Sequence, residues 1–316
     1  MLYFAAALFI IIALKYLSSV FVYLILSVFI TILFSPLVSW FEKKNLPTFI
    51  GYIASLLIFL LIFGIIFYIV DYSSKQFIQN IDIYKHKFTE ISKILNSYLN
   101  QYDLNLNFQS LNLIEIVKTA LSKAGVVLKG FLIVFIGVSF LLFEQKYFYK
   151  KLTLFSDKSS LNHFITSTQK YFIIKTFTSF LTGLFVAIML FAFDVPYAMF
   201  FGILAFFFNF IPVIGSIIAA IPGILMALIT YDIQTSLYVT VFYIIINTSI
   251  SNVLEPKIMG DGLNLSPAVV FFSLLLWGWV FGIVGMFLAV PLTMTLKIAL
   301  ESSEKTKKWA MLLSQS

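Results

Sequence analysis

Long apolar runs separated by short polar stretches dominate the 316-residue chain. A helix needs about 20 consecutive apolar residues to cross the hydrocarbon core of a bilayer, and most of these runs approach or exceed that length. The eight runs lie at 2–14, 16–35, 50–70, 125–143, 171–193, 197–229, 236–253 and 267–296. The pattern predicts an all-α membrane protein with about eight hydrophobic segments.

The sixth run, 197–229, is too long for one straight helix at about 1.5 Å per residue. Its centre also carries prolines, which remove backbone donors and free carbonyl groups that only protein or a water-filled cavity can satisfy. The interrupting residues are Asn209, Pro212, Gly215, Ser216, Pro222 and Gly223. Because broken membrane helices usually line a pathway or a binding site, we predict a broken or re-entrant helix that lines a pathway. The alternative is a kinked packing helix.

Lysines are distributed unevenly among the loops, and cytoplasmic loops usually carry the excess of basic residues. Lys43 and Lys44 follow the second run, the 144–170 loop holds five lysines, and the tail from 301 carries three more. We therefore expect these regions, including the C-terminus, to be cytoplasmic. Asp157 to Gln169 additionally resembles an interfacial helix, because Leu161, Phe164, Ile165 and Thr168 share one of its faces.

These patterns together predict six regions along the chain. They are N-terminal transmembrane helices (1–70), an extramembrane amphipathic helical insert (71–124), a transmembrane helix (125–143), a cytoplasmic linker with an interfacial helix (144–170), a C-terminal core that holds the predicted pathway (171–300) and a cytoplasmic tail (301–316). No internal repeat is visible by eye.

The number of crossings after residue 194 constrains how the sixth run is built. A chain that leaves an outside loop at Asp194 and ends in an inside tail must cross the membrane an odd number of times. One broken passage over 197–229 satisfies this condition with three crossings. A re-entrant hairpin there requires that a neighbouring segment does not span either, and the sequence leaves both arrangements open.

Apolar residues in the insert repeat at alternating steps of four and three, which is the spacing of a coiled-coil seam. The seam residues are Phe77, Ile81, Tyr84, Phe88, Ile91, Leu95, Tyr98 and Tyr102. Asn112 with Glu115 resembles a capping box that opens a second helix. The insert either forms a helical hairpin that packs on itself or contacts another subunit, and the length of the seam favours a homo-oligomer.

The inventory of reactive side chains excludes most enzymatic chemistry. The chain has no cysteine, all 21 basic residues are lysine, and the only histidines, His86 and His163, lie outside the apolar runs. No GxxxxGK[ST] loop for ATP is present either. We therefore expect a protein that is not an enzyme and that uses no cofactor or metal. The net charge of +7 comes from loop lysines, so it indicates membrane orientation rather than binding of nucleic acid.

Polar residues inside the apolar runs are the next candidates for function, because they are costly in lipid and often functional. Segment seven carries Asn247, Thr248, Ser251, Asn252 and Glu255. Helical spacing places three of them, at 248, 252 and 255, on one face, which would suit a cation or a polyol. The alternative is hydrogen bonding between helices, with Glu255 already at the interface.

Two lysines and a set of small residues complete the candidates. Lys175 shares a face with Ser179, and we expect its side chain, like that of Lys297, to reach toward the membrane surface. The last run contains glycines that permit close helix approach, followed by a proline. These predicted packing residues are Gly278, Gly282, Gly285 and Pro291.

Several spaced motifs in the C-terminal half resemble those of the autoinducer-2 exporter family. They are NFIPVIG at 209–215, AAIPG at 219–223, NVLEPKIMG at 252–260, LNLSPAVV at 263–270 and FGIVGMFLAVPL at 281–292. The resemblance implies a gradient-driven, oligomeric transporter of the bacterial inner membrane, linked either to export of the quorum-sensing signal or to sodium/proton antiport. One departure is that Ile250 and Ser251 stand where family members often have an acid, and Glu255 lies one turn later.

The leading hypothesis is a secondary transporter or exporter of a small polar solute in contact with membrane lipid. Its pathway would be lined by Asn209, Pro212, Gly215, Ser216, Pro222, Gly223, Asn247 and Asn252. Glu255 would bind a coupling cation or proton. The alternatives are a sodium or lithium/proton antiporter, a passive channel, and a non-transporting envelope scaffold that uses the insert to organise partners.

Overall fold

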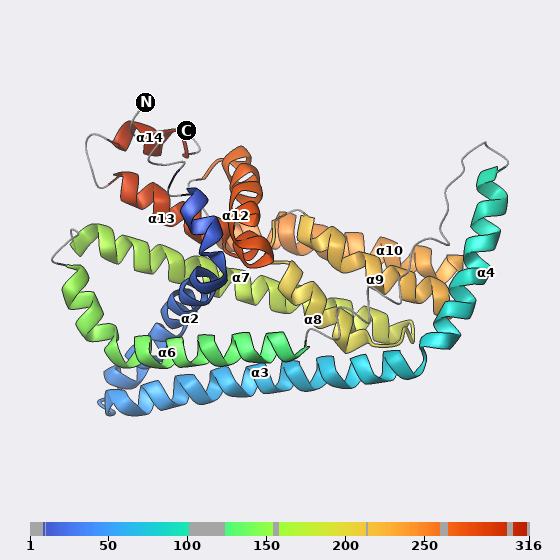
Figure 1. The fold of residues 1–316 in the computed structure, drawn as a ribbon, viewed down its shortest axis with the longest axis horizontal. Helices are drawn as coiled ribbons and strands as arrows, with labels where there is room; N and C mark the ends of the chain where they lie inside the picture. The colour runs from blue at the N-terminus through green and yellow to red at the C-terminus, as the bar shows by residue number, and fades with distance from the viewer. Residues whose placement is uncertain are drawn as a thin grey trace.

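The computed structural model describes residues 9, 11–100, 124–153, 158–212, 214–259, 265–301 and 306–314. All regular elements in these ranges are helices, which confirms the predicted all-α fold (Figure 1). They are α2 (Ser18–Lys43), α3 (Thr48–Gln79), α4 (Ile81–Asn100), α6 (Ala124–Leu152), α7 (Lys158–Ala192), α8 (Ala198–Phe208), α9 (Ile214–Thr230), α10 (Ile233–Asn247), the π-helix η2 (Thr248–Leu254), α11 (Glu255–Met259), α12 (Pro267–Phe287), α13 (Ala289–Glu301) and α14 (Lys307–Met311).

Within the described part of the chain, 6 helices are long and apolar enough to cross a membrane, while α8 and α9 are shorter. Large apolar side chains cover the outer faces of these helices, as on α3, where Leu57, Leu61 and Ile65 are exposed. A soluble protein would not expose such a continuous apolar surface. The fold is therefore that of a membrane protein whose outer surface contacts lipid.

Helices α2, α3 and α6 form the N-terminal unit. Val38, Val138 and Leu142 are fully buried where these helices pack together. Gly51 permits the close approach of α3 to α2, because a Cβ at this position would lie 3.1 Å from the Cα of Val38.

The sixth run is a hairpin of two helices, which we call the first hairpin (α8 and α9). The helix stops after Phe208 and restarts at Ile214, and a Cβ on Gly215 would collide with the carbonyl oxygen of Phe208. The two open ends of the hairpin, before α8 and after α9, lie together, and we call them its feet. The Tyr231 hydroxyl donates a hydrogen bond of 3.0 Å to the Asp194 carbonyl. The run therefore returns to the end from which it started.

A second chain reversal lies in the last apolar run, at Gly282, where φ is 66° and ψ is −146°. The arms on either side pair with one another: the indole Nε1 of Trp277 donates to Thr293 Oγ1 at 3.0 Å. The segment after α14 packs beside the start of the first arm, because the Ser266 N–H donates to the Leu313 carbonyl at 3.3 Å. We call the segment from Pro267 to Glu301 the second hairpin.

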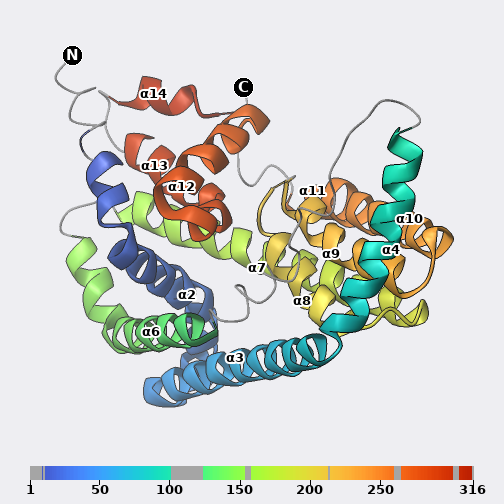
Figure 2. The same ribbon diagram turned by 45° about the vertical axis from the view of Figure 1, so that its right-hand side comes forward.

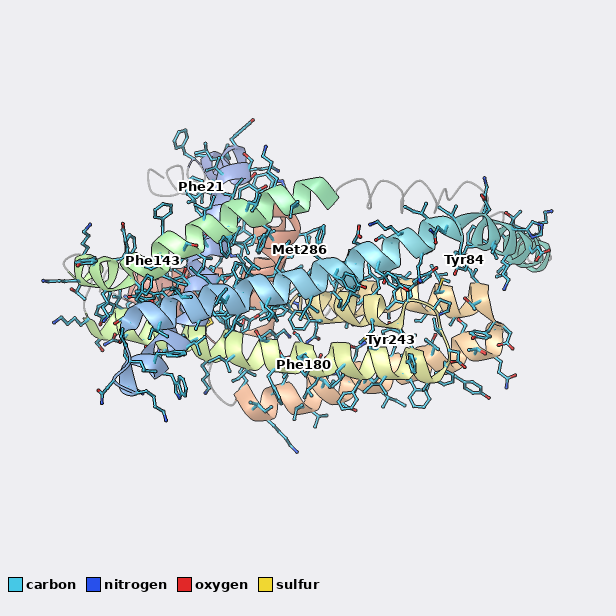
Figure 3. All side chains as sticks on the ribbon, turned by 90° about the horizontal axis from the view of Figure 1, so that it is seen from below. Phe21, Tyr84, Phe143, Phe180, Tyr243 and Met286 are labelled. Atoms are coloured by element: carbon cyan, nitrogen blue, oxygen red, sulfur yellow. The ribbon has the colours of Figure 1, made fainter. Side chains whose placement is uncertain are left out.

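The tips of the two hairpins meet in the interior. The rings of Phe210 and Phe287 stack with their centroids 4.3 Å apart, and Ile211 packs in one cluster with Leu274 and Ala289. Figures 1 and 2 show α8 and α9 on one side of this contact and α12 and α13 on the other. In Figure 3, Met286 of the second hairpin lies near the middle of the long axis, whereas Tyr84 lies near one end.

The hairpins enter from opposite ends of α7. The feet of the first hairpin lie at Asp194, just after the C-terminal end of α7. Leu265, just before the second hairpin, packs in a cluster with Tyr171 from the N-terminal half of α7. The sixth run thus turns back on itself, and the last run, although α12 is long enough to cross a membrane, is broken at Gly282. This is the form that the re-entrant alternative predicts.

Several predicted boundaries change. The interfacial helix expected at 157–169 is the first part of α7, which runs unbroken from Lys158 to Ala192. The break in the sixth run lies between the end of α8 at Phe208 and the start of α9 at Ile214, because α9 remains helical through Pro222. The capping box at Asn112 and Glu115 lies outside the described residues, as does most of the run at 2–14.

The seam of the insert is divided between two helices, because α3 extends to Gln79 and α4 begins at Ile81. Its first residues are covered by the chain itself: the rings of Phe77 and Tyr84 stack at 5.4 Å, and both contact Tyr197. Helix α4 then packs on α9. This part of the seam is used within the chain, and a homo-oligomer remains a prediction.

Replacement of Gly282 by alanine should lower the apparent melting temperature in detergent, because its φ of 66° with ψ of −146° lies in a region that is open essentially to glycine and costs other residues about 1–3 kcal/mol. Gly64→Ala is the matched control, since a Cβ at either position meets no atom within 4 Å and only Gly282 has a positive φ. Alanine should stabilise helix α3 at residue 64 by up to about 1 kcal/mol. Equal melting temperatures for the two variants would contradict the assigned turn.

Candidate functional site

A buried ion pair lies between α7 and the start of α11. Lys175 Nζ donates to both carboxylate oxygens of Glu255, at 2.7 and 2.9 Å, and the two side chains are only 6% and 15% exposed. Thr178 Oγ1 donates a third hydrogen bond to Glu255 Oε2 at 3.2 Å. The Glu255 carboxylate is thus neutralised and hydrogen-bonded inside the protein.

A second set of hydrogen bonds joins the tip of the first hairpin to its neighbours. Asn209 Nδ2 donates to Ser179 Oγ at 3.0 Å, and Ser251 Oγ donates to Asn209 Oδ1 at 3.2 Å. The amide of Asn209 therefore links α7 with η2. Because Ser179 follows Thr178 on α7 and Ser251 lies four residues before Glu255, the two sets form one polar cluster.

The π-helix η2 determines which residues of the seventh apolar run and its continuation to Glu255 face this cluster. A π-helix has more residues per turn than an α-helix and is frequent at functional sites. Ser251 and Glu255 point toward α7 as a result, whereas Thr248 and Asn252 are exposed. The predicted face of 248, 252 and 255 is therefore wrong, because it assumed a regular α-helical period.

Two expectations for buried charges are also corrected. Lys175 does not extend away from the protein but is 5% exposed and paired with Glu255, whose side chain is itself only 15% exposed. Lys297 is likewise buried, with its Nζ 3.8 Å from Glu301 Oε1. A single charge is strongly disfavoured in a low-dielectric interior, so pairing replaces contact with water.

The remaining predicted pathway residues are arranged along the first hairpin. Pro212 and Gly215 form the turn at its tip, and Ser216 lies in the first turn of α9. Pro222 and Gly223 lie halfway along α9, where a Cβ on Gly223 would approach the Tyr243 hydroxyl to 2.7 Å. These two residues permit close packing of α9 on α10, at a distance from the tip.

Asn247 and Asn252 are not brought to the cluster, since Asn247 is half-buried at the end of α10 and Asn252 is exposed. The glycines of the second hairpin serve its own fold. Gly278 accommodates Met286 from the opposite arm, with a Cβ-to-Cγ approach of 2.8 Å, while Gly282 makes the turn. Pro291 is buried in α13.

Sequence reasoning missed that Lys175, Thr178 and Ser251 lie together with Glu255 and Asn209. The spacing of polar residues on α7 was a usable signal, because 175, 178, 179 and 182 share one helical face. All four of these residues are buried. The partners of these side chains on other helices could not be predicted from spacing. They depend on the π-helix η2 and on the reversal of the chain in the first hairpin.

The cluster is closed in this conformation. Lys175, Ser179 and Asn209 are each 5% exposed or less, and an open surface depression lies elsewhere, between Glu42 and Lys146 at the α2–α3 turn. No group of three or more His, Cys, Asp or Glu side chains that could hold a metal ion occurs among the described residues. The hydroxyl, amide and carboxylate oxygens instead suit a hydrogen-bonding solute or a hard monovalent cation.

Outside the membrane segments, two titratable groups are shifted near the feet of the first hairpin. The backbone N–H of Thr235 donates to Asp232 at 2.7 Å and holds the pKa of this carboxyl below its usual value. Burial, followed by the hydrogen bond with Tyr197, raises the pKa of Tyr84. The Tyr84 hydroxyl is therefore neutral at physiological pH.

Comparison with known proteins identifies the family. A protein of Haemophilus influenzae is 37% identical, with 98% of this chain and 94% of the relative covered. The AI-2 transport protein TqsA of Escherichia coli is 31% identical, with 95% and 91% covered, and Escherichia coli YhhT is 27% identical, with 94% and 88% covered. The family described as AI-2E family transporter matches residues 4–305. The chain belongs to this family of membrane transport proteins.

Proposed function

We propose that the protein is a gradient-driven secondary transporter that exports a small polar solute through gates formed by the two hairpin tips. The observation that supports this most is the meeting of two broken hairpins, from opposite ends of α7, beside a buried polar cluster. In secondary transporters, discontinuous helices commonly place free backbone groups beside the substrate near the middle of the membrane.

Opening of one hairpin at a time would give alternating access to the cluster. The tips are held together by apolar contacts, chiefly the stacked rings of Phe210 and Phe287. Withdrawal of the first hairpin would open the cluster toward the end where Asp194 lies, while the second hairpin keeps the other end closed. Opening would break these apolar contacts and the two hydrogen bonds of Asn209.

The chemistry of Asn209 indicates the kind of solute. Movement of the first hairpin would separate Asn209 from Ser179 and Ser251 and leave buried donors and acceptors without partners. A solute that carries several hydroxyl groups could replace these hydrogen bonds. Since TqsA is an AI-2 transport protein, AI-2 is the first solute to test, with Glu255 as the site for a coupling cation or proton.

Sodium or lithium/proton antiport is the second candidate, and the Lys175–Glu255 pair favours it. The buried pair has no net charge. A monovalent cation that bound Glu255 while Lys175 released one proton would leave the site neutral, which a low-dielectric interior requires. Family membership argues against the non-transporting scaffold.

The test is transport by purified protein in proteoliposomes under imposed sodium and proton gradients. Saturable, gradient-dependent movement of AI-2 would support the exporter. Proton movement on addition of sodium or lithium, without movement of AI-2, would support the antiporter. Flux that neither saturates nor depends on a gradient would indicate a passive channel and contradict the proposal.

Asn209→Ala should reduce the transport rate by roughly tenfold or more, since it removes the amide that would bind the solute in the open state through two hydrogen bonds worth about 1 kcal/mol each. Asn252→Ala is the matched control, because Asn252 is an exposed asparagine in the same region. Initial rates at equal reconstituted amounts provide the measurement. If both variants transport alike, the cluster is not the pathway.

Lys175→Gln and Glu255→Gln should each destabilise the protein by about 3–5 kcal/mol, because each leaves one buried charge unpaired. The double variant should be more stable than either single variant, since it contains neither charge. Lys146→Gln, which removes the exposed partner of Glu42, should change stability by less than about 1 kcal/mol. Melting temperatures in detergent give the order of stability of the variants. A double variant less stable than both single variants would refute the pairing of Lys175 with Glu255.

A further inference from the structure

Helix α4 contacts both feet of the first hairpin. One foot is Tyr197, the residue before α8, and the other is Thr230, the last residue of α9. The contacts come from Tyr84 and Lys87, which are three residues apart and therefore lie on one face of α4. Figure 3 shows Tyr84 at the end of the molecule where α4 begins.

The contact with the first foot is aromatic and hydrogen-bonded. The hydroxyl groups of Tyr84 and Tyr197 lie 3.1 Å apart, and Asn80 Nδ2 donates to the Tyr197 hydroxyl at 3.4 Å. The ring of Phe77 meets that of Tyr197 edge-on with the centroids 5.9 Å apart. The bend between α3 and α4 thus surrounds the Tyr197 side chain.

The contact with the second foot uses charge. Lys87 Nζ donates to the Thr230 carbonyl at 3.2 Å. The last carbonyls of a helix have no partner inside the helix and carry the negative end of its dipole, so a lysine here is favourable. The same helix therefore binds the start of one arm and the end of the other.

The backbone at the first foot depends on such contacts. Tyr197 has φ of 62° and Asp194 has φ of 52°, which is the left-handed region that residues other than glycine rarely adopt. Surrounding structure must hold such a conformation in place. The Tyr231 hydroxyl, bonded to the Asp194 carbonyl, ties the feet to each other, so a shift of α4 would act on both together.

We propose that Tyr84 and Lys87 are positioning residues that clamp the feet of the first hairpin, so that α4 sets how readily this hairpin opens. The inference rests on the proposed function of the hairpin as a gate. The start of the insert would then have a role in transport, because Tyr84 and Lys87 contact the two feet of the first hairpin. A partner or subunit that moved α4 would change the opening of the hairpin without contacting the polar cluster.

The absence of cysteine from the chain permits a direct test. A single cysteine, Ser216→Cys, in the first turn of α9 would report opening through its rate of reaction with a membrane-impermeant maleimide added to either face of proteoliposomes. Tyr84→Phe and Lys87→Met should each raise this rate several-fold, and the double variant more. Lys87→Arg, which keeps a cationic donor, should restore the original rate.

Matched controls make the same chemical changes nearby. Tyr72→Phe removes a hydroxyl that is bonded only to Gln76 of the same helix, and Lys85→Met removes an exposed lysine of α4. Labelling rates equal to those of the controls would overturn the clamp and leave the transport proposal standing. A clear rise in labelling, in a protein that moves no solute or ion, would support the clamp and refute the transport role of the hairpin.

Discussion

The contact between the two hairpin tips is the constraint on which the rest of the structure depends. A chain that reverses inside a membrane leaves backbone groups without helical partners, and lipid cannot satisfy them. Here each reversal, after Phe208 and at Gly282, is covered by the other hairpin through Phe210, Phe287 and their neighbours. Each tip is thus covered by the other, and the two hairpins pack as one unit beside α7.

The polar cluster meets a similar requirement, because buried charges and polar side chains also need partners inside the protein. Lys175 and Glu255 are buried only because each neutralises the other, and Asn209 has a partner for both ends of its amide. A cluster with no net charge and with paired hydrogen bonds avoids the much larger free-energy cost of a lone buried charge. Any solute or ion that entered the cluster would have to replace these partners.

The sequence was sufficient to predict the membrane class and the position of the break near Asn209, whereas the role of Glu255 in ion coupling stays a prediction. Apolar run length and proline chemistry are local properties, so they can be read along the chain. The orientation of Ser251, the partner of Lys175 and the reversal at Gly282 could not be predicted in this way. They depend on a π-helix, on contacts between distant segments, and on a backbone angle that a GxxxG pattern does not distinguish from simple packing. The two opposed hairpins likewise share no repeat that is visible by eye.

The glycines that follow each reversal also limit how this sequence can change over time. A single methyl group on Gly215 would meet the carbonyl oxygen of Phe208, and one on Gly285 would meet that of Trp277. These obstacles belong to the backbone, which cannot rotate away as a side chain does. We therefore expect evolution to tolerate only glycine at these two positions. At apolar positions that face lipid, one apolar residue can replace another.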